Sequence, residues 1–168
     1  FIPISSNFVP IENVEAQWQA YAAARERLNL PADYGVWRVC RNILVTDSDA
    51  RAEEILADPD GPLTYYYRYL RGVRSMEALA EQPHATLEEL NTMLEVPQAL
   101  EDCVIAGSAE RVLERLVALV DRLGPFGTLV MVGHDWDETG LWQSSMEQLA
   151  TRVMPALSRH AESIARAT

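Results

Sequence analysis

The stretch VIAGSAERVLERLVALVDRLGPFGTLVMVG, residues 104–133, decides the fold class of this chain of 168 residues. Its two ends are short apolar runs rich in valine, a residue favoured in strands, and its middle repeats large apolar residues at helical spacing. Ser108, directly after Gly107, is a typical N-cap for that helix. A buried strand, an amphipathic helix and a second buried strand predict a parallel sheet covered by helices.

The same alternation of strands and helices extends over the rest of the chain. Further strands are predicted at 1–7 and 36–45, and further helices at 11–28, 47–57 and 141–157. The strand that begins the quoted stretch is predicted to extend over 102–107. Residues 63–97 form an insertion-like helical stretch with a capping box, Thr86 and Glu89, in its second half. This order fits either a doubly wound sheet or part of a (β/α)8 barrel, and both bind ligands at the carboxyl ends of their strands.

The composition excludes several classes of function. The net charge is −11 and all 14 basic residues are arginine, so nucleic-acid binding has no electrostatic basis and these residues hold no lysine for a Schiff base. Cys40 and Cys103 lack the spacing of a zinc site or a disulfide framework, so we expect two reduced core cysteines and no metal. No run approaches the roughly 20 apolar residues of a membrane span, and the first residues lack a signal-peptide pattern. We therefore expect a cytoplasmic protein without a membrane or nucleic-acid partner.

Polar residues at the carboxyl ends of the first and last predicted strands are the candidates for a ligand site. They are Ser5, Ser6 and Asn7 at the first end and His134, Asp135 and Trp136 at the last. A histidine at this place can exchange a proton near neutral pH or hydrogen-bond an aromatic cofactor. The alternative is an ordinary surface loop before the last helix.

The strand at 36–45 carries polar residues that need partners if it is buried. Arg38, Cys40 and Asn42 share one face by the two-residue period of a strand, and Arg41 faces the other way. A buried arginine is rare unless it is paired, so we expect an ion pair between Arg41 and a carboxylate of a neighbouring element.

Two other groups of residues have both a functional and a structural interpretation. Gly107 and Ser108 resemble the start of an anion-binding helix, but the same pair begins many ordinary helices. A cluster of tyrosines either packs a helix against the sheet or walls a substrate pocket. Its members are Tyr65, Tyr66, Tyr67 and Tyr69.

No self-contained catalytic motif is present, and function is indicated instead by a resemblance. The C-terminal part of the luciferase-like flavin-dependent monooxygenases closely resembles three segments in family order: WRVCRNILVTDSDARAEEI (37–55), VIAGSAERVLERLVALVDRLGPFGTLVMVGHDWDE (104–138) and SMEQLATRVMPAL (145–157). This group includes bacterial luciferase and limonene monooxygenase-type enzymes, and its fold is a (β/α)8 barrel of roughly twice this length. The resemblance implies that residues 1–168 are the C-terminal half of one such α/β barrel domain, with parallel strands and outer helices, and that the N-terminal half is absent.

The resemblance also implies a cofactor and partners. Relatives use reduced FMN, supplied by a separate flavin reductase, together with O2 to oxidise a small organic substrate, while the protein holds the flavin and excludes water. A homodimer and the N-terminal half of the barrel are the expected protein partners. Cys40 and Asn42 stand where sulfonate monooxygenases have an arginine and a histidine, which argues against a sulfonate and favours an apolar substrate.

The position of each residue in the family pattern gives its expected role. His134 is the candidate catalytic residue. The candidate cofactor-binding residues are Ser5, Ser6, Asn7, Asn42, Asp135 and Trp136. Two other functions stay open, a deazaflavin (F420)-dependent oxidoreductase of the same fold and a non-catalytic flavin-binding or structural half-barrel.

Overall fold

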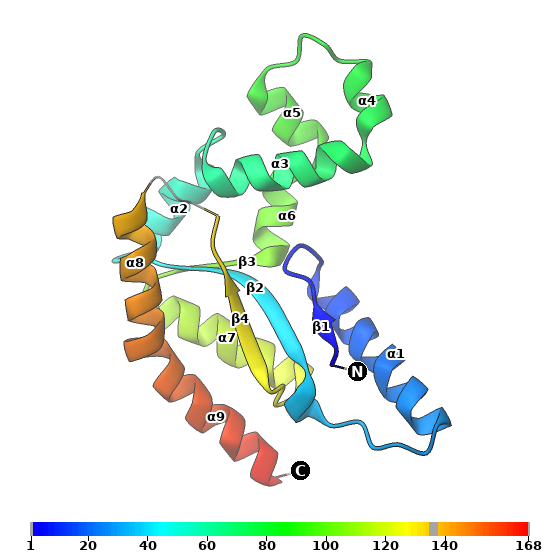
Figure 1. Cartoon of the computed structure of the whole chain (residues 1–168). Helices are drawn as coiled ribbons and strands as arrows, with labels where there is room; N and C mark the ends of the chain where they lie inside the picture. Colours follow the sequence, from blue (N-terminus) through cyan, green and yellow to red (C-terminus); the bar gives the residue numbers. More distant parts are fainter. Residues whose placement is uncertain (1, 135–137, 168) are drawn as a thin grey trace.

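The computed structural model describes residues 2–134 and 138–167, in which strands and helices alternate (Figure 1). The strands are β1 (Ile4–Ser5), β2 (Arg38–Val45), β3 (Val104–Gly107) and β4 (Thr128–Val132). The helices are α1 (Ile11–Arg27), α2 (Asp49–Ala57), α3 (Pro62–Arg74), α4 (Met76–Ala80), α5 (Leu87–Met93), α6 (Val96–Cys103), α7 (Ala109–Leu123), α8 (Thr139–Gln148) and α9 (Met154–Ala167). A 3-10 turn, η1 (Tyr34–Val36), precedes β2, and a π-helical turn, η2 (Leu149–Val153), joins α8 to α9.

Strand β2 is the centre of a four-stranded parallel sheet, because both of its edges are paired. β4 pairs with residues 38–42 along one edge. β1 and β3 share the other edge, where β1 pairs with residues 38–39 and β3 with residues 42–45. The segments that follow β1 and β4 therefore reach β2 from opposite sides.

The two faces of the sheet bury separate apolar cores. Val39, Ile43 and Val45 of β2 pack with α1, α7, η2 and α9 on one face. Leu44 packs on the other face with α2, α3, α6 and Trp142 of α8. Figure 1 shows α4 and α5 at the far end of the helical segment after α2, away from the sheet. This second face, between β2 and α3, is where the candidate site is found.

The parallel sheet with its flanking helices agrees with the predicted α/β class, but two details differ from the predicted elements. β3 begins at Val104, because α6 continues through Cys103, and residues 63–97 form α3, α4, α5 and the start of α6. The sequence left the neighbour of the last strand open, and in the structure β4 pairs with β2, which at eight residues is twice as long as β3. Among the described helices, none is both long and apolar enough to cross a membrane.

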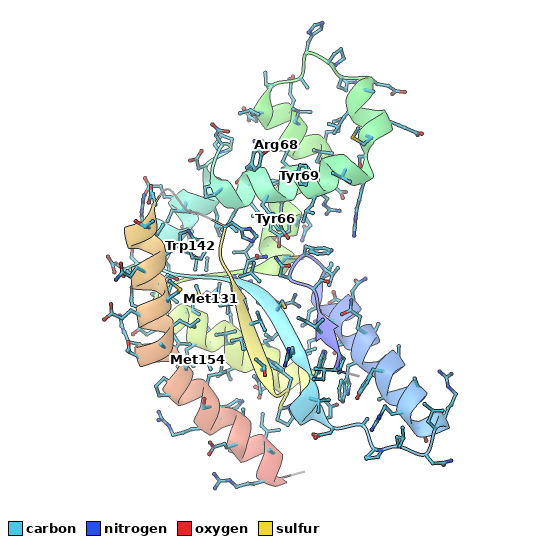
Figure 2. The ribbon with its side chains drawn as sticks, in the orientation of Figure 1. Tyr66, Arg68, Tyr69, Met131, Trp142 and Met154 are labelled. Atoms are coloured by element: carbon cyan, nitrogen blue, oxygen red, sulfur yellow. The ribbon has the colours of Figure 1, made fainter. Side chains whose placement is uncertain are left out.

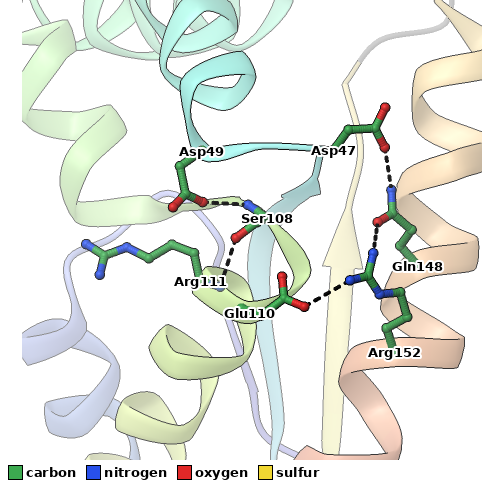
Figure 3. A network of polar contacts seen from close by, with 7 residues as sticks. All are labelled: Asp47, Asp49, Ser108, Glu110, Arg111, Gln148 and Arg152. Atoms are coloured by element: carbon green, nitrogen blue, oxygen red, sulfur yellow. Dashed lines mark hydrogen bonds and ion pairs between the residues drawn. The ribbon is translucent and has the colours of Figure 1, made fainter.

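Side-chain caps hold the starts of α2 and α7 at the carboxyl end of the sheet. Ser48 Oγ accepts a hydrogen bond from the backbone N–H of Arg51, and Ser108 Oγ accepts one from that of Arg111, both at 3.2 Å. The backbone N–H of Ser108 in turn donates to Oδ1 of Asp49 at 2.7 Å (Figure 3). Ser48 is the N-cap of the helix predicted at 47–57, and the predicted N-cap Ser108 and the capping box of α5 are confirmed.

Candidate functional site

Asn42 is the centre of a buried polar cluster between β2 and α3. Its side chain is 0% exposed. Its amide nitrogen, which carries two protons, lies within hydrogen-bond distance of three acceptors: the carbonyl oxygens of Asn7 (3.1 Å) and Cys103 (3.4 Å) and the hydroxyl of Tyr67 (2.6 Å). Its amide oxygen accepts from Nδ2 of Asn7 at 2.8 Å and lies 2.6 Å from Nε2 of His134. Every polar atom of this buried side chain is thus satisfied, as burial in a core requires.

His134 joins the cluster from the segment after β4. Its side chain is half-buried, and burial lowers the pKa of the imidazole, so the ring is neutral at pH 7. The ring packs on that of Tyr66, with centroids 4.0 Å apart and planes inclined by 31°. Tyr66 lies between α3 and the sheet (Figure 2). The two rings form an aromatic pair beside the enclosed amide of Asn42.

Three of the predicted site residues therefore come together. Asn7 follows β1 by two residues and His134 follows β4 by two residues. Both reach the level of Asn42, because β1 and β4 pair in parallel with opposite edges of β2. Asn7 extends the cluster by a hydrogen bond from its Nδ2 to the hydroxyl of Tyr66 at 3.3 Å.

The other predicted cofactor-binding residues are not part of this cluster. Ser5 is buried, and its Oγ accepts a hydrogen bond from the indole N–H of Trp37 at 2.9 Å. No hydrogen bond joins the side chain of Ser6 to the cluster within the described part of the chain. Asp135 and Trp136 lie outside the described residues. A role in cofactor binding stays a prediction for all four.

The ion pair expected for Arg41 is not found among the described residues. Its side chain is 2% exposed, and Nη1 donates to the carbonyl oxygens of Ser6 (3.5 Å) and Val9 (3.2 Å). Nη2 has no hydrogen-bond partner in the described part of the chain. Backbone carbonyls take the place of a carboxylate, because the segment after β1 brings them to this position.

The tyrosines of α3 divide between core, site and surface. Tyr67 is 2% exposed, and burial raises the pKa of its hydroxyl, which stays protonated. Tyr66 is half-buried against the imidazole, while Tyr65 and Tyr69 are each 60% exposed. The i, i+4 spacing of Leu63 and Tyr67 is a sequence signal for the buried side of the helix. The spacing of apolar residues along this helix does not by itself predict that Tyr66 lies at the site.

The helix start at Gly107 and Ser108 has the structural role, because the chain supplies its own anion. The hydrogen bond from the backbone of Ser108 to Asp49 lowers the pKa of that carboxyl. The carboxylate thus holds the place that an external anion would take. Within the described residues no group of three His, Cys, Asp or Glu side chains could hold a metal ion.

A cavity of about 180 Å³ adjoins the cluster between the segment after β1, α3 and α6. Its lining includes Phe8, Tyr67, Arg71, Arg74 and Cys103. Cofactor and ligand pockets typically measure roughly 300–1,000 Å³. This cavity alone is therefore too small for a large cofactor, and it is suited to one end of a ligand.

Comparison with known proteins supports the predicted resemblance. No protein-family model matches the chain. Among curated proteins, 3,6-diketocamphane 1,6-monooxygenase of Pseudomonas putida is 26% identical over 163 residues, which cover 94% of this chain and 41% of the relative.

Two solved structures resemble the fold. One is the oxygenating constituent of 3,6-diketocamphane monooxygenase of Pseudomonas putida, a type II Baeyer-Villiger monooxygenase in complex with FMN; its TM-score is 0.67 and its identity 25%, over 92% of this chain and 42% of that one. The other, monooxygenase RslO1 of Streptomyces bottropensis, is 13% identical with a TM-score of 0.56, over 91% of this chain and 41% of that one, and shows the fold alone. The chain thus spans about two fifths of the length of the proteins it matches. The resemblance to luciferase-like flavin monooxygenases and the α/β fold class of a partial (β/α)8 barrel are confirmed.

Proposed function

We propose that this chain is part of an FMN-dependent monooxygenase that uses reduced FMN and O2 to oxidise a small, apolar organic substrate. The cluster of Asn7, Asn42 and His134 carries this proposal, because it lies where the strands of α/β enzymes present ligand-binding residues. The FMN in the matched structure from Pseudomonas putida adds support.

The residues of the cluster fit the edge of a planar heteroaromatic ring. His134 is the member that reaches a ligand, because its ring is half-buried while Asn42 is enclosed. Tyr66 extends the aromatic surface, and Asn7 and Asn42 hold His134 in place. Bound FMN would supply the reaction with O2. The chain's own residues would orient the ring and keep water away.

The proposal includes a complete barrel, in which residues outside this chain supply the missing strands and helices. Residues 129–132 of β4 are only half-buried, although their sequence is that of a core strand, and the adjoining cavity is too small for a flavin. Residues 1–168 would then be the C-terminal half of a single barrel domain, and the N-terminal half would supply the rest of the flavin site. Ser5, Ser6, Asp135 and Trp136 would complete the cofactor contacts.

The same proposal includes a homodimer, a separate flavin reductase and a cytoplasmic location. The free thiols of Cys40 and Cys103, both buried, are consistent with a reducing compartment. Size-exclusion chromatography with light scattering tests the homodimer.

The test is oxygen consumption by protein that contains this chain together with the first half of the barrel. With chemically reduced FMN and a bicyclic diketone as the probe, we expect O2-dependent formation of an oxygenated product. Turnover with reduced F420 and none with FMN would contradict the proposal in favour of the deazaflavin enzyme. Flavin binding without oxidation of any probe from a panel of ketones, aldehydes and terpenes would contradict it in favour of the non-catalytic half-barrel.

In the same assay, His134→Ala should lower turnover at least tenfold, which corresponds to about 1.4 kcal/mol. The substitution removes the one ring of the cluster that reaches the ligand. His84→Ala is the matched control, because His84 is exposed near the α4–α5 end of the molecule. Equal rates for the two variants would remove His134 from the site.

A further inference from the structure

The side-chain amide of Asn42 has one chemically consistent orientation. Its nitrogen faces the backbone carbonyl oxygens of Asn7 and Cys103, at 3.1 and 3.4 Å, and a carbonyl oxygen only accepts hydrogen bonds. Its oxygen faces Nδ2 of Asn7, which only donates, at 2.8 Å. If the nitrogen and oxygen of this amide were exchanged, its oxygen would face two carbonyl oxygens and its nitrogen would face Nδ2 of Asn7. Neither arrangement allows a hydrogen bond. Oδ1 of Asn42 therefore points toward His134.

This orientation decides which nitrogen of His134 carries the proton. Nε2 lies 2.6 Å from Oδ1 of Asn42, and an amide oxygen has no proton to give, so Nε2 must be the donor. Burial lowers the pKa of the ring, so at neutral pH it holds a single proton. Nδ1 is then unprotonated, and it has no hydrogen-bond partner among the residues that the structure describes. The contact with Tyr66, at 4.0 Å between ring centroids, restrains the plane of the ring.

We propose that Asn42 is a positioning residue that holds His134 as the Nε2–H tautomer and thereby presents Nδ1 as an acceptor to an N–H or O–H group of the ligand. His134 then acts as a hydrogen-bond acceptor or general base and not as a proton donor. The assignment rests on the proposed function only for the identity of the ligand, because the tautomer is a property of the protein without cofactor.

The groups around the imidazole do not oppose this assignment. From α3 the ring meets Tyr66, and from β2 it meets the uncharged amide of Asn42. Behind Asn42 lie the hydroxyl of Tyr67 and the carbonyl of Cys103, and burial raises the pKa of both the Tyr67 hydroxyl and the Cys103 thiol. These groups are neutral at pH 7, so among the described residues no charged side chain contacts the imidazole to stabilise its doubly protonated form.

The test is ¹⁵N NMR of protein labelled at its three histidines, recorded between pH 6 and pH 8 without flavin. We expect His134 to show a protonated Nε2 that exchanges slowly with solvent and an Nδ1 at the chemical shift of a bare ring nitrogen. His84, whose side chain is exposed, provides a solvent-exposed histidine for comparison in the same sample. A proton on Nδ1 of His134, or a doubly protonated and therefore cationic ring at pH 7, would overturn the proposal without any variant.

Two variants separate positioning from general support of the fold. Asn42→Leu should move the His134 nitrogen signals toward those of His84 and speed the exchange of the Nε2 proton at least tenfold. Tyr66→Phe keeps the ring contact and should leave the tautomer unchanged. Unaltered His134 signals in a folded Asn42→Leu protein would overturn the proposal. Because no flavin is present, that result would stand apart from a failure of the monooxygenase assay.

Discussion

Gly107 is a residue at which backbone conformation and helix capping depend on each other. Its φ is +149°, and a Cβ added there would lie 2.8 Å from Cγ of Arg111 and 2.9 Å from Oδ1 of Asp49. A side chain at this position would therefore collide with the carboxylate that caps α7 through Ser108. Only glycine combines this φ with so close an approach.

Gly107→Ala should therefore lower the free energy of unfolding by about 1–3 kcal/mol, as backbone strain of this kind does. Gly140→Ala is the matched control on α8, where an added Cβ meets nothing within 4 Å. In a helix that second change should be neutral or stabilise by up to about 1 kcal/mol. Urea unfolding measures both, and similar values for the two variants would contradict the strain assigned to Gly107.

At the scale of residues, the sequence predicted which strand ends carry the candidate site but not which side chains meet there. Asn7, Asn42 and His134 join one cluster, whereas Ser5 bonds Trp37 elsewhere. β1 is only two residues long, so the two-residue period of a strand does not say which of the residues after it face the site. The partners of Asn42 come from four parts of the chain that are distant in sequence, the segments after β1 and β4 and the helices α3 and α6. No spacing rule predicts that they meet.

At the scale of elements, β2 and α8 are joined by one buried hydrogen bond. Val45 lies beyond Asn42, the last residue of β2 that pairs with β4. Its backbone N–H would be unpaired on that edge, but it donates to Oγ of Ser145 at 2.8 Å. The side chain of Ser145 is 0% exposed, so water cannot replace it.

Ser145→Ala should lower the free energy of unfolding by about 1–3 kcal/mol, because it leaves a buried donor without an acceptor. Ser144→Ala removes the same hydroxyl from the exposed side of the same helix, where the change should stay within about 0.5 kcal/mol. Chemical denaturation compares the two. A loss in Ser144→Ala as large as that in Ser145→Ala would show that helix propensity, and not the bond to Val45, is responsible.

The elements were largely predictable because each has a local cause. Apolar runs gave β2 and β4, and side-chain caps gave the starts of α2, α5 and α7. The order of the strands in the sheet was not predictable. The spacing of apolar residues along a strand indicates which side chains are buried, but it does not indicate which other strand lies beside it. Within residues 63–97 the capping box gave the start of α5. The starts of α4 and α6 were missed, because neither helix has a side-chain cap within the described part of the chain.

At the scale of the whole molecule, the sheet of this chain has an incompletely covered edge strand. Residues 129–132 of β4 are half-buried, and Ile2 and Ile4 near the start are 55% and 62% exposed. An apolar strand at the edge of a sheet invites pairing with another chain. The N-terminal half of a barrel would cover such a surface.

Expressed as residues 1–168 alone, the protein should therefore self-associate. Sedimentation velocity should show species heavier than the 18.8 kDa monomer, and co-expression with the first half of the barrel should replace them by one defined complex. A soluble monomer at micromolar concentration would contradict the idea that this chain is half of a barrel.

The carboxylate of Asp49 competes with any free anion for the backbone N–H of Ser108 at the start of α7. A group held by the chain itself has an effective concentration at its site far above that of a free anion in solution. A phosphate would have to displace Asp49 from the N–H of Ser108 before it could bind there. An anion at this helix start would therefore bind more weakly than it would in the absence of Asp49, because the displacement of the carboxylate adds to the free-energy cost of binding.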